Sequence, residues 1–323
     1  MWVKRMASSK PFRIFQTYSV LAATGNRNDG PPLFWGHALK QMEGVAHLHL
    51  DGLYPLQEFG VPDGWLVVDW GEDGLTSVMP HVPKDWEDDG APRIYVCSDT
   101  HYSEAAYQAR LAKARTATLT LCNQWAAAER MRADGVSAAY LPHAVDLTAY
   151  PCAPLAIPKY DVSFVGHINH ISRAEFLDTL FKAFPNFWFG KRFFEQAAEI
   201  YRKSKIVLNQ AINADLNMRA FEVCATKSFL LTPWVPDLER NGFLDGVNCA
   251  VYRTTEEAVE KATKYLADDV SRETIAQAGY DLVMSRHTYG HRAAVVVQTL
   301  KHLVKWDGDA EVVAEAAGAA GGS

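Results

Sequence analysis

The sequence has little of what marks several protein classes. Its five cysteines are scattered and include no C-x-x-C pair, which excludes a disulfide framework and a cysteine-rich zinc site. No apolar run approaches the length of a transmembrane helix, and polar residues interrupt the stretch after Lys4 and Arg5, unlike a signal peptide. The formal net charge is −6, so no global field draws the chain to nucleic acid or anionic membranes. We therefore expect a cytoplasmic protein with reduced thiols and no integral membrane segment.

Two sequence motifs are also missing. No G-x-G-x-x-G follows the first predicted strand, where the chain reads TYSVLAATGNRNDG (17–30), so a dinucleotide-dependent oxidoreductase is a poor interpretation. No D-x-D triplet follows a predicted strand either. The nearest acidic groups are EDD (87–89), in a loop without an assigned place, and DGD (307–309), in the C-terminal tail.

What the sequence does have is an alternation of short apolar runs and helical patterns. In the first half, strands are predicted at 12–18, 46–52, 64–70, 92–98, 117–123 and 137–143, and the clearest helices at 103–115 and 124–135. Ser103 is suited to cap the first of these helices, and Gly135 is suited to end the second. Strands and helices that alternate with short connections predict a parallel sheet covered on both faces.

A proline-rich stretch, YPCAPLAIPKYD (150–161), interrupts this alternation and favours an extended linker. The pattern then resumes with strands at 161–167, 187–190, 205–211, 228–232 and 249–252, and with helices at 172–184, 195–204, 255–269 and about 291–305. We predict two α/β domains at 1–150 and 160–290, joined by a linker at 151–159. The small residues of 308–323 have nothing to pack against and predict a disordered tail.

Polar residues directly after strands are candidates for a functional site, because doubly wound sheets bind ligands at the carboxyl ends of their strands. The segment CSDTHYSEA (97–105) places Asp99 and His101 there, and VVDWGEDG (67–74) places Asp69 likewise. A histidine titrates near neutral pH and can deprotonate a substrate hydroxyl. Capping and turn formation explain the same residues structurally. We name His101, Asp99 and Asp69 as catalytic candidates.

The segment ADLNMRAFEVCATKSFLLT (214–232) carries an arginine and a glutamate, three residues apart, where a helix should begin. Asp215 is suited to cap that helix, and Arg219 and Glu222 then share one face. An intrahelical ion pair is the structural explanation. The functional explanation is an anion site, in which the helix N-terminus and the arginine hold a phosphate and the carboxylate accepts hydrogen bonds from a ribose diol.

Three segments resemble, in order and spacing, the glycosyltransferases of the group 1 superfamily, and within it the branch related to spore-maturation proteins. They are YDVSFVGHINHISRAEFL (160–177), IYRKSKIVLNQAINADLNMRAFEVCATKSFLLT (200–232) and GYDLVMSRHTYGHRA (279–293). AYLPHAVDLTAY (139–150) resembles the stretch that this branch carries before its linker. The resemblance implies a GT-B fold: two Rossmann-like, doubly wound domains that face each other across a cleft. The C-terminal domain would hold a nucleotide sugar, the N-terminal domain the acceptor, and the last helix would cross back to the first domain.

The resemblance also implies a donor site. Glu222 matches the carboxylate that holds the donor ribose, and Arg219, with Asn217 beside it, falls where a basic residue contacts the diphosphate. Gly166 and His167 match the tight turn after the first strand of the C-terminal domain, where a side chain would block the phosphates.

Further donor-site residues follow from the same likeness. Arg173 matches a basic residue at the start of the next helix, and Gly190 and Lys191 end the second strand, near the expected place of the nucleobase. Tyr201 and Asn209 are weaker candidates. The chain departs from the superfamily at Ala214, where a second glutamate usually stands eight positions before the ribose-binding one. This departure leaves the identity of the sugar open.

The function implied is transfer of a sugar from a nucleotide-diphosphate donor, with UDP-sugars favoured, to an acceptor hydroxyl with retention of anomeric configuration. No metal or other cofactor is expected, because folds of this class usually stabilise the leaving phosphate without one. The acceptor stays open among a saccharide, a polymer, a protein and a modified DNA base, and the oligomeric state is open as well. A non-catalytic or structural member of the same fold and a sugar-nucleotide epimerase are the alternatives.

Overall fold

The computed structural model describes residues 11–18, 30–49, 62–68, 90–98, 100, 103–153, 157–168, 171–211 and 214–305. By its contacts the chain divides into two compact units, residues 1–141 with 292–323 and residues 142–291. Residues 142–150, which the sequence analysis assigns to the first domain, thus group with the second unit. Within the described ranges, none of the helices has the length and apolar character needed to span a membrane.

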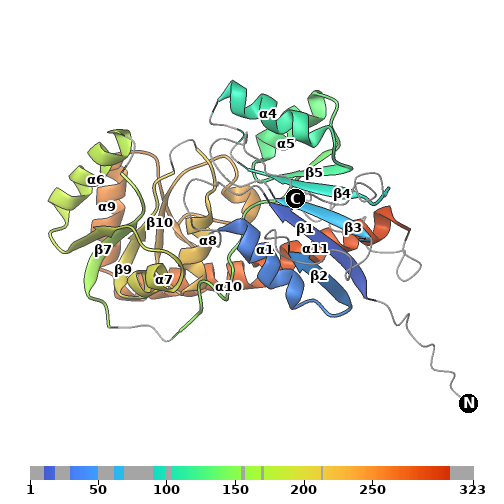
Figure 1. Ribbon diagram of the computed structural model, residues 1–323. Coiled ribbons are helices and arrows are strands. Elements are labelled where there is room, and N and C mark those ends of the chain that lie inside the picture. Colours follow the sequence, from blue (N-terminus) through green and yellow to red (C-terminus); the bar gives the residue numbers. More distant parts are fainter. Residues whose placement is uncertain are drawn as a thin grey trace, which may run out of the picture. The chain divides into compact units, whose positions relative to one another are not determined.

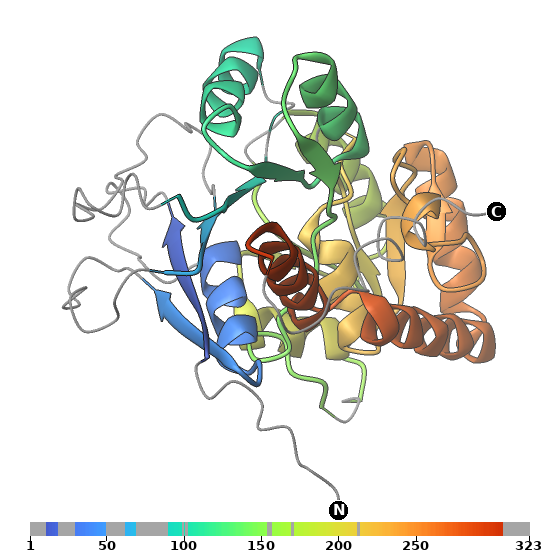
Figure 2. The ribbon, with the colours of Figure 1, turned by 90° about the vertical axis from the view of Figure 1, so that its right-hand side faces the viewer.

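The described part of the first unit contains a six-stranded sheet of order β2-β1-β3-β4-β5-β6, and all neighbouring strands are parallel. Its strands are β1 (Phe12–Tyr18), β2 (Val45–His49), β3 (Gly64–Val68), β4 (Arg93–Cys97), β5 (Leu119–Cys122) and β6 (Ala138–Tyr140). The helices are α1 (Pro31–Lys40), α4 (Glu104–Ala114), α5 (Trp125–Ala133) and α11 (Tyr289–Leu303), which begins in the second unit. Figure 2 shows α4 and α5 on one side of the strands and α1 and α11 on the other.

Helix α11 packs closely against the first unit's sheet. A Cβ atom at Gly64, the first residue of β3, would lie only 2.8 Å from Cδ2 of Leu300 in α11. Leu300 is fully buried, and so are Ile14 and Leu66 of the sheet. The glycine therefore leaves the space in which the last helix covers this face, and the burial of apolar side chains stabilises the contact.

The second unit contains a five-stranded parallel sheet of order β11-β10-β9-β7-β8. The strands are β7 (Tyr160–Val165), β8 (Phe187–Gly190), β9 (Ser204–Leu208), β10 (Leu230–Pro233) and β11 (Ala250–Tyr252). The helices are α6 (Ile171–Ala183), α7 (Phe194–Arg202), α8 (Met218–Ala225), α9 (Thr255–Leu266) and α10 (Asp269–Arg286). Helices α6 and α9 share one buried core with the strands, and α7 and α8 lie toward the other face (Figure 1).

Both sheets are parallel and carry helices on both faces, which confirms the predicted doubly wound α/β organisation. In the second sheet the chain enters at β7, and the next two strands lie on opposite sides of it. This reversal creates a topological switch point, and sheets of this kind bind ligands at the carboxyl ends of the strands beside it.

Three helices differ from the prediction. Helix α1 is not among the helices predicted from the sequence. Its first turn contains Pro31 and Pro32, at positions where no intrahelical N–H donor is needed. The helix predicted at 255–269 ends earlier, at Leu266, and α10 follows as a separate helix. The side chain of Asp268 caps α10 by accepting from the Ser271 N–H at 3.0 Å.

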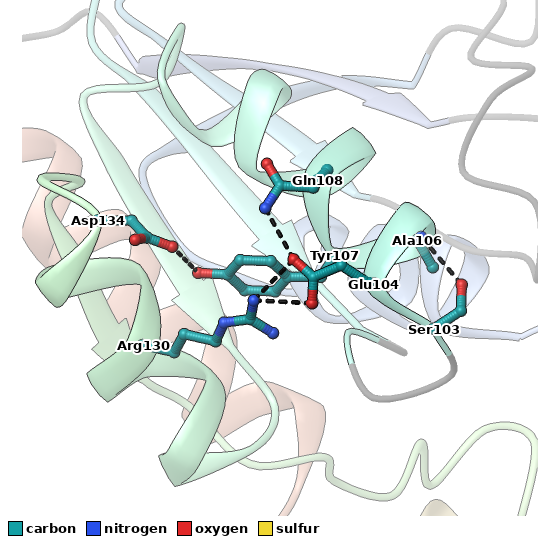
Figure 3. A network of polar contacts seen from close by, with 7 residues as sticks. All are labelled: Ser103, Glu104, Ala106, Tyr107, Gln108, Arg130 and Asp134. Atoms are coloured by element: carbon teal, nitrogen blue, oxygen red, sulfur yellow. Dashed lines mark hydrogen bonds and ion pairs between the residues drawn. The ribbon is translucent and has the colours of Figure 1, made fainter.

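A polar network ties α4 to α5 in the first unit (Figure 3). Arg130 donates to both carboxylate oxygens of Glu104 at 2.8 Å, and its guanidinium carbon lies 3.5 Å from the centroid of the Tyr107 ring. The Tyr107 hydroxyl donates to Asp134 at 2.6 Å. Ser103 caps α4 as predicted, accepting from the backbone N–H of Ala106 at 3.1 Å. The cap by Ser103 and the pairing of Glu104 with Arg130 of α5 thus both fix the first turn of α4.

The variant Tyr107→Phe removes one hydrogen bond from this network and keeps the buried ring. We expect it to lower the free energy of unfolding by about 1 kcal/mol, the usual net contribution of such a bond. The variant Glu104→Gln, which alters an exposed ion pair, should have a smaller effect. Urea unfolding measures both changes. A loss in Glu104→Gln as large as that in Tyr107→Phe would show that the exposed pair ties the two helices together.

Candidate functional site

Polar side chains gather where β7, β8 and β9 of the second sheet end. The N–H of Gly166, just after β7, donates to the carbonyl of Gly190 at the end of β8 at 3.0 Å. The N–H of Asn209, just after β9, donates to the carbonyl of Leu231 in β10 at 2.8 Å. These bonds extend the sheet by one residue at its carboxyl edge, so the side chains that follow start from fixed backbone positions.

Arg219 lies in the first turn of α8, close to this edge. Its Nη1 donates to Oδ1 of Asn209 at 3.0 Å, and its guanidinium carbon is 4.9 Å from the centroid of the Phe164 ring. Its Nε is buried and has no hydrogen-bond partner. Buried polar atoms are nearly always paired in folded proteins. The protein itself therefore leaves part of the hydrogen-bonding capacity of Arg219 unused.

Gly166 provides the space for this arginine. A Cβ atom at residue 166 would lie 2.8 Å from Nη2 of Arg219 and 3.0 Å from the ring of Phe164. Real Cβ contacts are longer than this, so any side chain here would displace the guanidinium. The glycine expected at this position is needed for the close approach of Arg219 to the end of β7.

A second arginine lies on the same aromatic ring. Arg173, in the first turn of α6, is buried and has its guanidinium carbon 5.6 Å from the centroid of Phe164. It donates from Nη1 to the carbonyl of His167 at 3.0 Å and from Nη2 to the carbonyl of Gln210 at 2.7 Å. Phe164 thus holds Arg173 and Arg219 by cation–π contacts at one edge of the sheet. Two guanidinium groups and the N-terminal ends of α6 and α8 make this edge suited to an anion.

Asn209 connects these elements. Its Oδ1 accepts from both Arg219 and Nδ2 of Asn217, the latter at 3.2 Å, and its Nδ2 donates to Oγ1 of Thr232 at 3.1 Å. Asn209 is almost completely buried. The amide therefore joins the end of β9, the end of β10 and the start of α8 into one hydrogen-bonded unit.

The cap of α8 differs from the prediction. Asn217, and not Asp215, occupies the N-cap position, and the helix begins at Met218. Asn217 makes no side-chain capping bond, because its amide donates to Asn209, while its Oδ1 is buried without a partner. The bond to Asn209 draws the chain before α8 toward β9. Ala214, which lies in this connection, adopts a left-handed backbone conformation with φ of 52°.

Glu222 lies one turn further along α8 and is buried. The Tyr201 hydroxyl, in α7, donates to its Oε2 at 3.3 Å, and the Tyr150 hydroxyl also bonds to the carboxylate. Burial raises the pKa of Glu222 above its ordinary value, whereas the charge of Arg219 and the two tyrosine hydroxyls act to lower it.

The structure does not support the simple explanation of Arg219 and Glu222 as a helical ion pair. No bridge between them occurs among the ion pairs of the described ranges. Arg219 is engaged by Asn209, Phe164 and the Tyr201 hydroxyl, and Glu222 by the hydroxyls of Tyr150 and Tyr201. The charges of Arg219 and Glu222 attract each other at longer range, without a direct hydrogen bond between the guanidinium and the carboxylate.

Most of the predicted donor-site residues come together in this cluster: Gly166, Arg173, Tyr201, Asn209, Asn217, Arg219 and Glu222. Three others contribute less. His167 offers its carbonyl to Arg173 and has an exposed side chain, and Gly190 offers its carbonyl to Gly166. Lys191 is exposed, with Nζ 4.9 Å from the centroid of the Phe193 ring.

The catalytic candidates Asp69, Asp99 and His101 lie outside the residues that the structure describes. Sequence reasoning missed two members of the cluster in the second unit. Phe164 reads as an ordinary core residue of a strand, and Tyr150 only ends a segment noted for its resemblance. Within the described ranges, no group of three or more His, Cys, Asp and Glu side chains is placed to hold a metal ion.

Residues 161–298 match a protein family described as glycosyl transferase-like. No curated protein sequence matches the chain. Among solved structures, a sucrose-phosphate synthase from Thermosynechococcus elongatus is similar with a TM-score of 0.55 and 10% identity, over 91% of this chain and 89% of that one. The Anabaena protein Alr3699/HepE, solved in complex with UDP, has a TM-score of 0.59 and 10% identity, over 90% of this chain and 99% of that one.

A third similar structure is a putative UDP-N-acetylglucosamine 2-epimerase from Listeria monocytogenes. Its TM-score is 0.57 at 12% identity, over 93% of this chain and 98% of that one. Identities this low show the fold, and the fold is GT-B, as predicted. Residues 161–298 therefore resemble a glycosyl transferase-like family, and the chain that contains them has the GT-B fold.

The variant Gly166→Ala tests the packing of Arg219. The added methyl group mainly displaces the flexible end of Arg219 and meets the Phe164 ring at 3.0 Å, so we expect the protein to fold while an anionic ligand of this edge, tested with UDP, binds about tenfold more weakly, a change of about 1.4 kcal/mol. Gly36→Ala in α1 is the matched control, since a Cβ there meets nothing closer than 3.7 Å. Isothermal titration calorimetry measures both. Unchanged affinity in Gly166→Ala would mean that Arg219 does not contact the ligand from this position.

Proposed function

We propose that the chain transfers a sugar from a nucleoside-diphosphate donor to an acceptor hydroxyl, with the second unit holding the donor. The observation that carries this proposal is the cluster at the carboxyl edge of the second sheet. There, a buried carboxylate and two arginines lie on connected elements, around a glycine that leaves room for one of them. The glycosyl transferase-like match of residues 161–298 covers the same elements.

The arginines are suited to the diphosphate. When a sugar–diphosphate bond breaks, negative charge builds on the leaving phosphate, and groups that bind this charge more strongly in the transition state accelerate the reaction. Arg219 retains unused hydrogen-bonding capacity, and Arg173 is fixed by two backbone carbonyls. Such preorganised cations supply the stabilisation, and we propose that the transfer needs no metal ion.

Glu222 is suited to the ribose. A carboxylate accepts hydrogen bonds from both hydroxyls of a diol, and these bonds to a charged acceptor are strong. Glu222 lies on the same helix as Arg219, three residues along. That spacing corresponds to a rise of about 4.5 Å, so one helix presents a group for the phosphate and a group for the adjacent sugar.

UDP-sugars are the donors we favour, and the Anabaena structure with bound UDP supports this choice. We further propose retention of anomeric configuration and membership of the branch related to spore-maturation proteins, both from the resemblance of the motifs. A cytoplasmic location is supported by the thiols, since all five cysteines are free and four are buried. The proposed acceptor is a hydroxyl of a saccharide, polymer, protein or modified DNA base.

Binding of UDP, GDP, ADP and CMP, with and without magnesium, tests the proposal. We expect one nucleoside diphosphate to bind the wild type, and Glu222→Gln and Arg219→Ala to weaken it by about tenfold or more. Glu273→Gln, an exposed carboxylate of α10, is the matched control and should bind normally. Calorimetry and thermal shift give the affinities.

Full binding by both site variants would contradict the donor-site assignment. If no nucleotide binds the folded wild type, the non-catalytic alternative takes the place of this proposal. Mass spectrometry of the nucleotide after incubation separates transfer from epimerisation. Transfer releases the nucleoside diphosphate, whereas epimerisation of an intact donor leaves its mass unchanged.

A further inference from the structure

We propose that Tyr150 and Tyr201 are positioning residues, whose hydroxyls hold the Glu222 carboxylate charged and fixed in place for the donor ribose. The functional part of this inference rests on the proposed function. The contact between the tyrosines and the carboxylate can be measured without any ligand.

The two tyrosines form a stacked pair at the carboxylate. Their ring centroids are 6.5 Å apart with an interplanar angle of 11°, and both side chains are buried. The hydroxyl of Tyr201 lies 3.3 Å from Oε2 of Glu222, and that of Tyr150 bonds to the same carboxylate. Because the rings come from different parts of the chain, α7 and the stretch before Pro151, the carboxylate is held by two independent elements.

Tyr150 is fixed by the turn that precedes it. Oδ1 of the buried Asp146 accepts from the N–H groups of Thr148 and Ala149 at 2.7 and 2.8 Å, and the N–H of Tyr150 donates to the Asp146 carbonyl at 2.9 Å. The ring of Tyr150 also contacts the ring of Phe194 edge-on, at a centroid distance of 6.4 Å. These contacts place the hydroxyl at Glu222 without relying on Glu222 itself.

The chemistry of the hydroxyls makes them donors. Burial raises the pKa of both tyrosines, so both hydroxyls stay protonated over the whole working range of pH. A neutral hydroxyl beside a carboxylate donates to it, and this bond favours the charged form of Glu222 over the protonated form. If the tyrosines were only packing residues, phenylalanine would replace them without effect on the titration of Glu222.

Among the residues that the structure describes, Arg219 is the charged group that acts on Glu222. It lies on the same helix, and α7 contributes Tyr201. Helix α10 and strand β10 also pack against α8. His287, at the end of α10, contacts Phe221, with centroids 5.2 Å apart, and the thiol of Cys224 is influenced by Cys249. The tyrosine hydroxyls and Arg219 are therefore the groups that oppose the desolvation of Glu222.

The first experiment measures UDP affinity against pH for wild type, Tyr150→Phe and Tyr201→Phe. Affinity should rise as pH rises through the titration of Glu222, and this midpoint should move up by about one pH unit in each variant. Because UDP also titrates, Glu222→Gln is introduced into the wild type and into each tyrosine variant. The pH profile of each glutamine chain is subtracted from that of its glutamate counterpart, and only the remaining pH dependence is assigned to Glu222. Tyr107→Phe, which removes a tyrosine–carboxylate bond in the first unit, should leave the midpoint unchanged.

The second experiment needs no ligand. Because the pKa of Glu222 is raised in the folded state, the wild type loses stability as pH rises from the ordinary value of 4.5 through the native value. The Glu222→Gln variant has no such loss. The free energy of unfolding of Glu222→Gln minus that of the wild type therefore increases over this pH range and then becomes constant. In the Tyr150→Phe and Tyr201→Phe backgrounds, this increase should extend to higher pH.

The outcomes are separable. An unchanged stability window in both phenylalanine backgrounds would overturn the inference, whatever the nucleotide results. If the stability window shifts in the phenylalanine backgrounds but the wild type binds no nucleotide, the tyrosine–carboxylate contact is established. The proposed function, and with it the ribose role of Glu222, is then overturned. A shifted window together with a shifted midpoint of UDP binding supports both. If one of the two phenylalanine variants does not fold, the other still tests the inference, because each hydroxyl is expected to have the same effect.

Discussion

The burial of one carboxylate, that of Glu222, is the constraint on which the candidate site depends. A charge removed from water is unfavourable unless it is paired or hydrogen-bonded, and here burial raises the pKa of the group. The surroundings offset this cost with two tyrosine hydroxyls and the nearby charge of Arg219. None of these neighbours forms a direct ion pair with it among the described contacts, so the carboxylate keeps its capacity to accept further hydrogen bonds. A protein can hold a costly group of this kind where it serves binding, since stability and function often oppose each other at such sites.

The positive part of the site follows from the same backbone. Strand β7 ends with Phe164 and Val165, and Gly166 follows directly. This short stretch supplies both the ring that two arginines contact and the space that one of them occupies. Asn209 then fixes the start of α8 relative to β9, so Arg219 and Glu222 cannot move independently. The sheet edge therefore supports the groups that we propose for phosphate and ribose. Preorganisation of this kind reduces the entropy lost when a ligand binds.

Much of this organisation can be predicted from the sequence, for identifiable reasons. Apolar runs such as FRIFQTY and FWFG mark strands β1 and β8 at their observed bounds, and the spacing of Arg219 and Glu222 places them on one helix. Local rules fail where tertiary contacts compete with them. Asp215 and Asn217 are about equally good caps by propensity, and Asn217, which is bonded to Asn209, occupies the N-cap position. Helix α1 is not predicted, and it accommodates two prolines in its first turn. Tyr150 could not be assigned to Glu222, because the pairing of residues so distant in sequence depends on the fold.

The most direct test of the account compares two ligands that differ only in the ribose hydroxyls. Calorimetric titration of the wild type with UDP and with 2′,3′-dideoxy-UDP isolates the contact assigned to Glu222. Removing both hydroxyls should weaken binding by about tenfold or more, the loss expected for hydrogen bonds to a charged acceptor. The same pair should bind Glu222→Gln with a much smaller difference. Equal affinity of the wild type for the two nucleotides would contradict the central claim that the buried carboxylate holds the donor ribose.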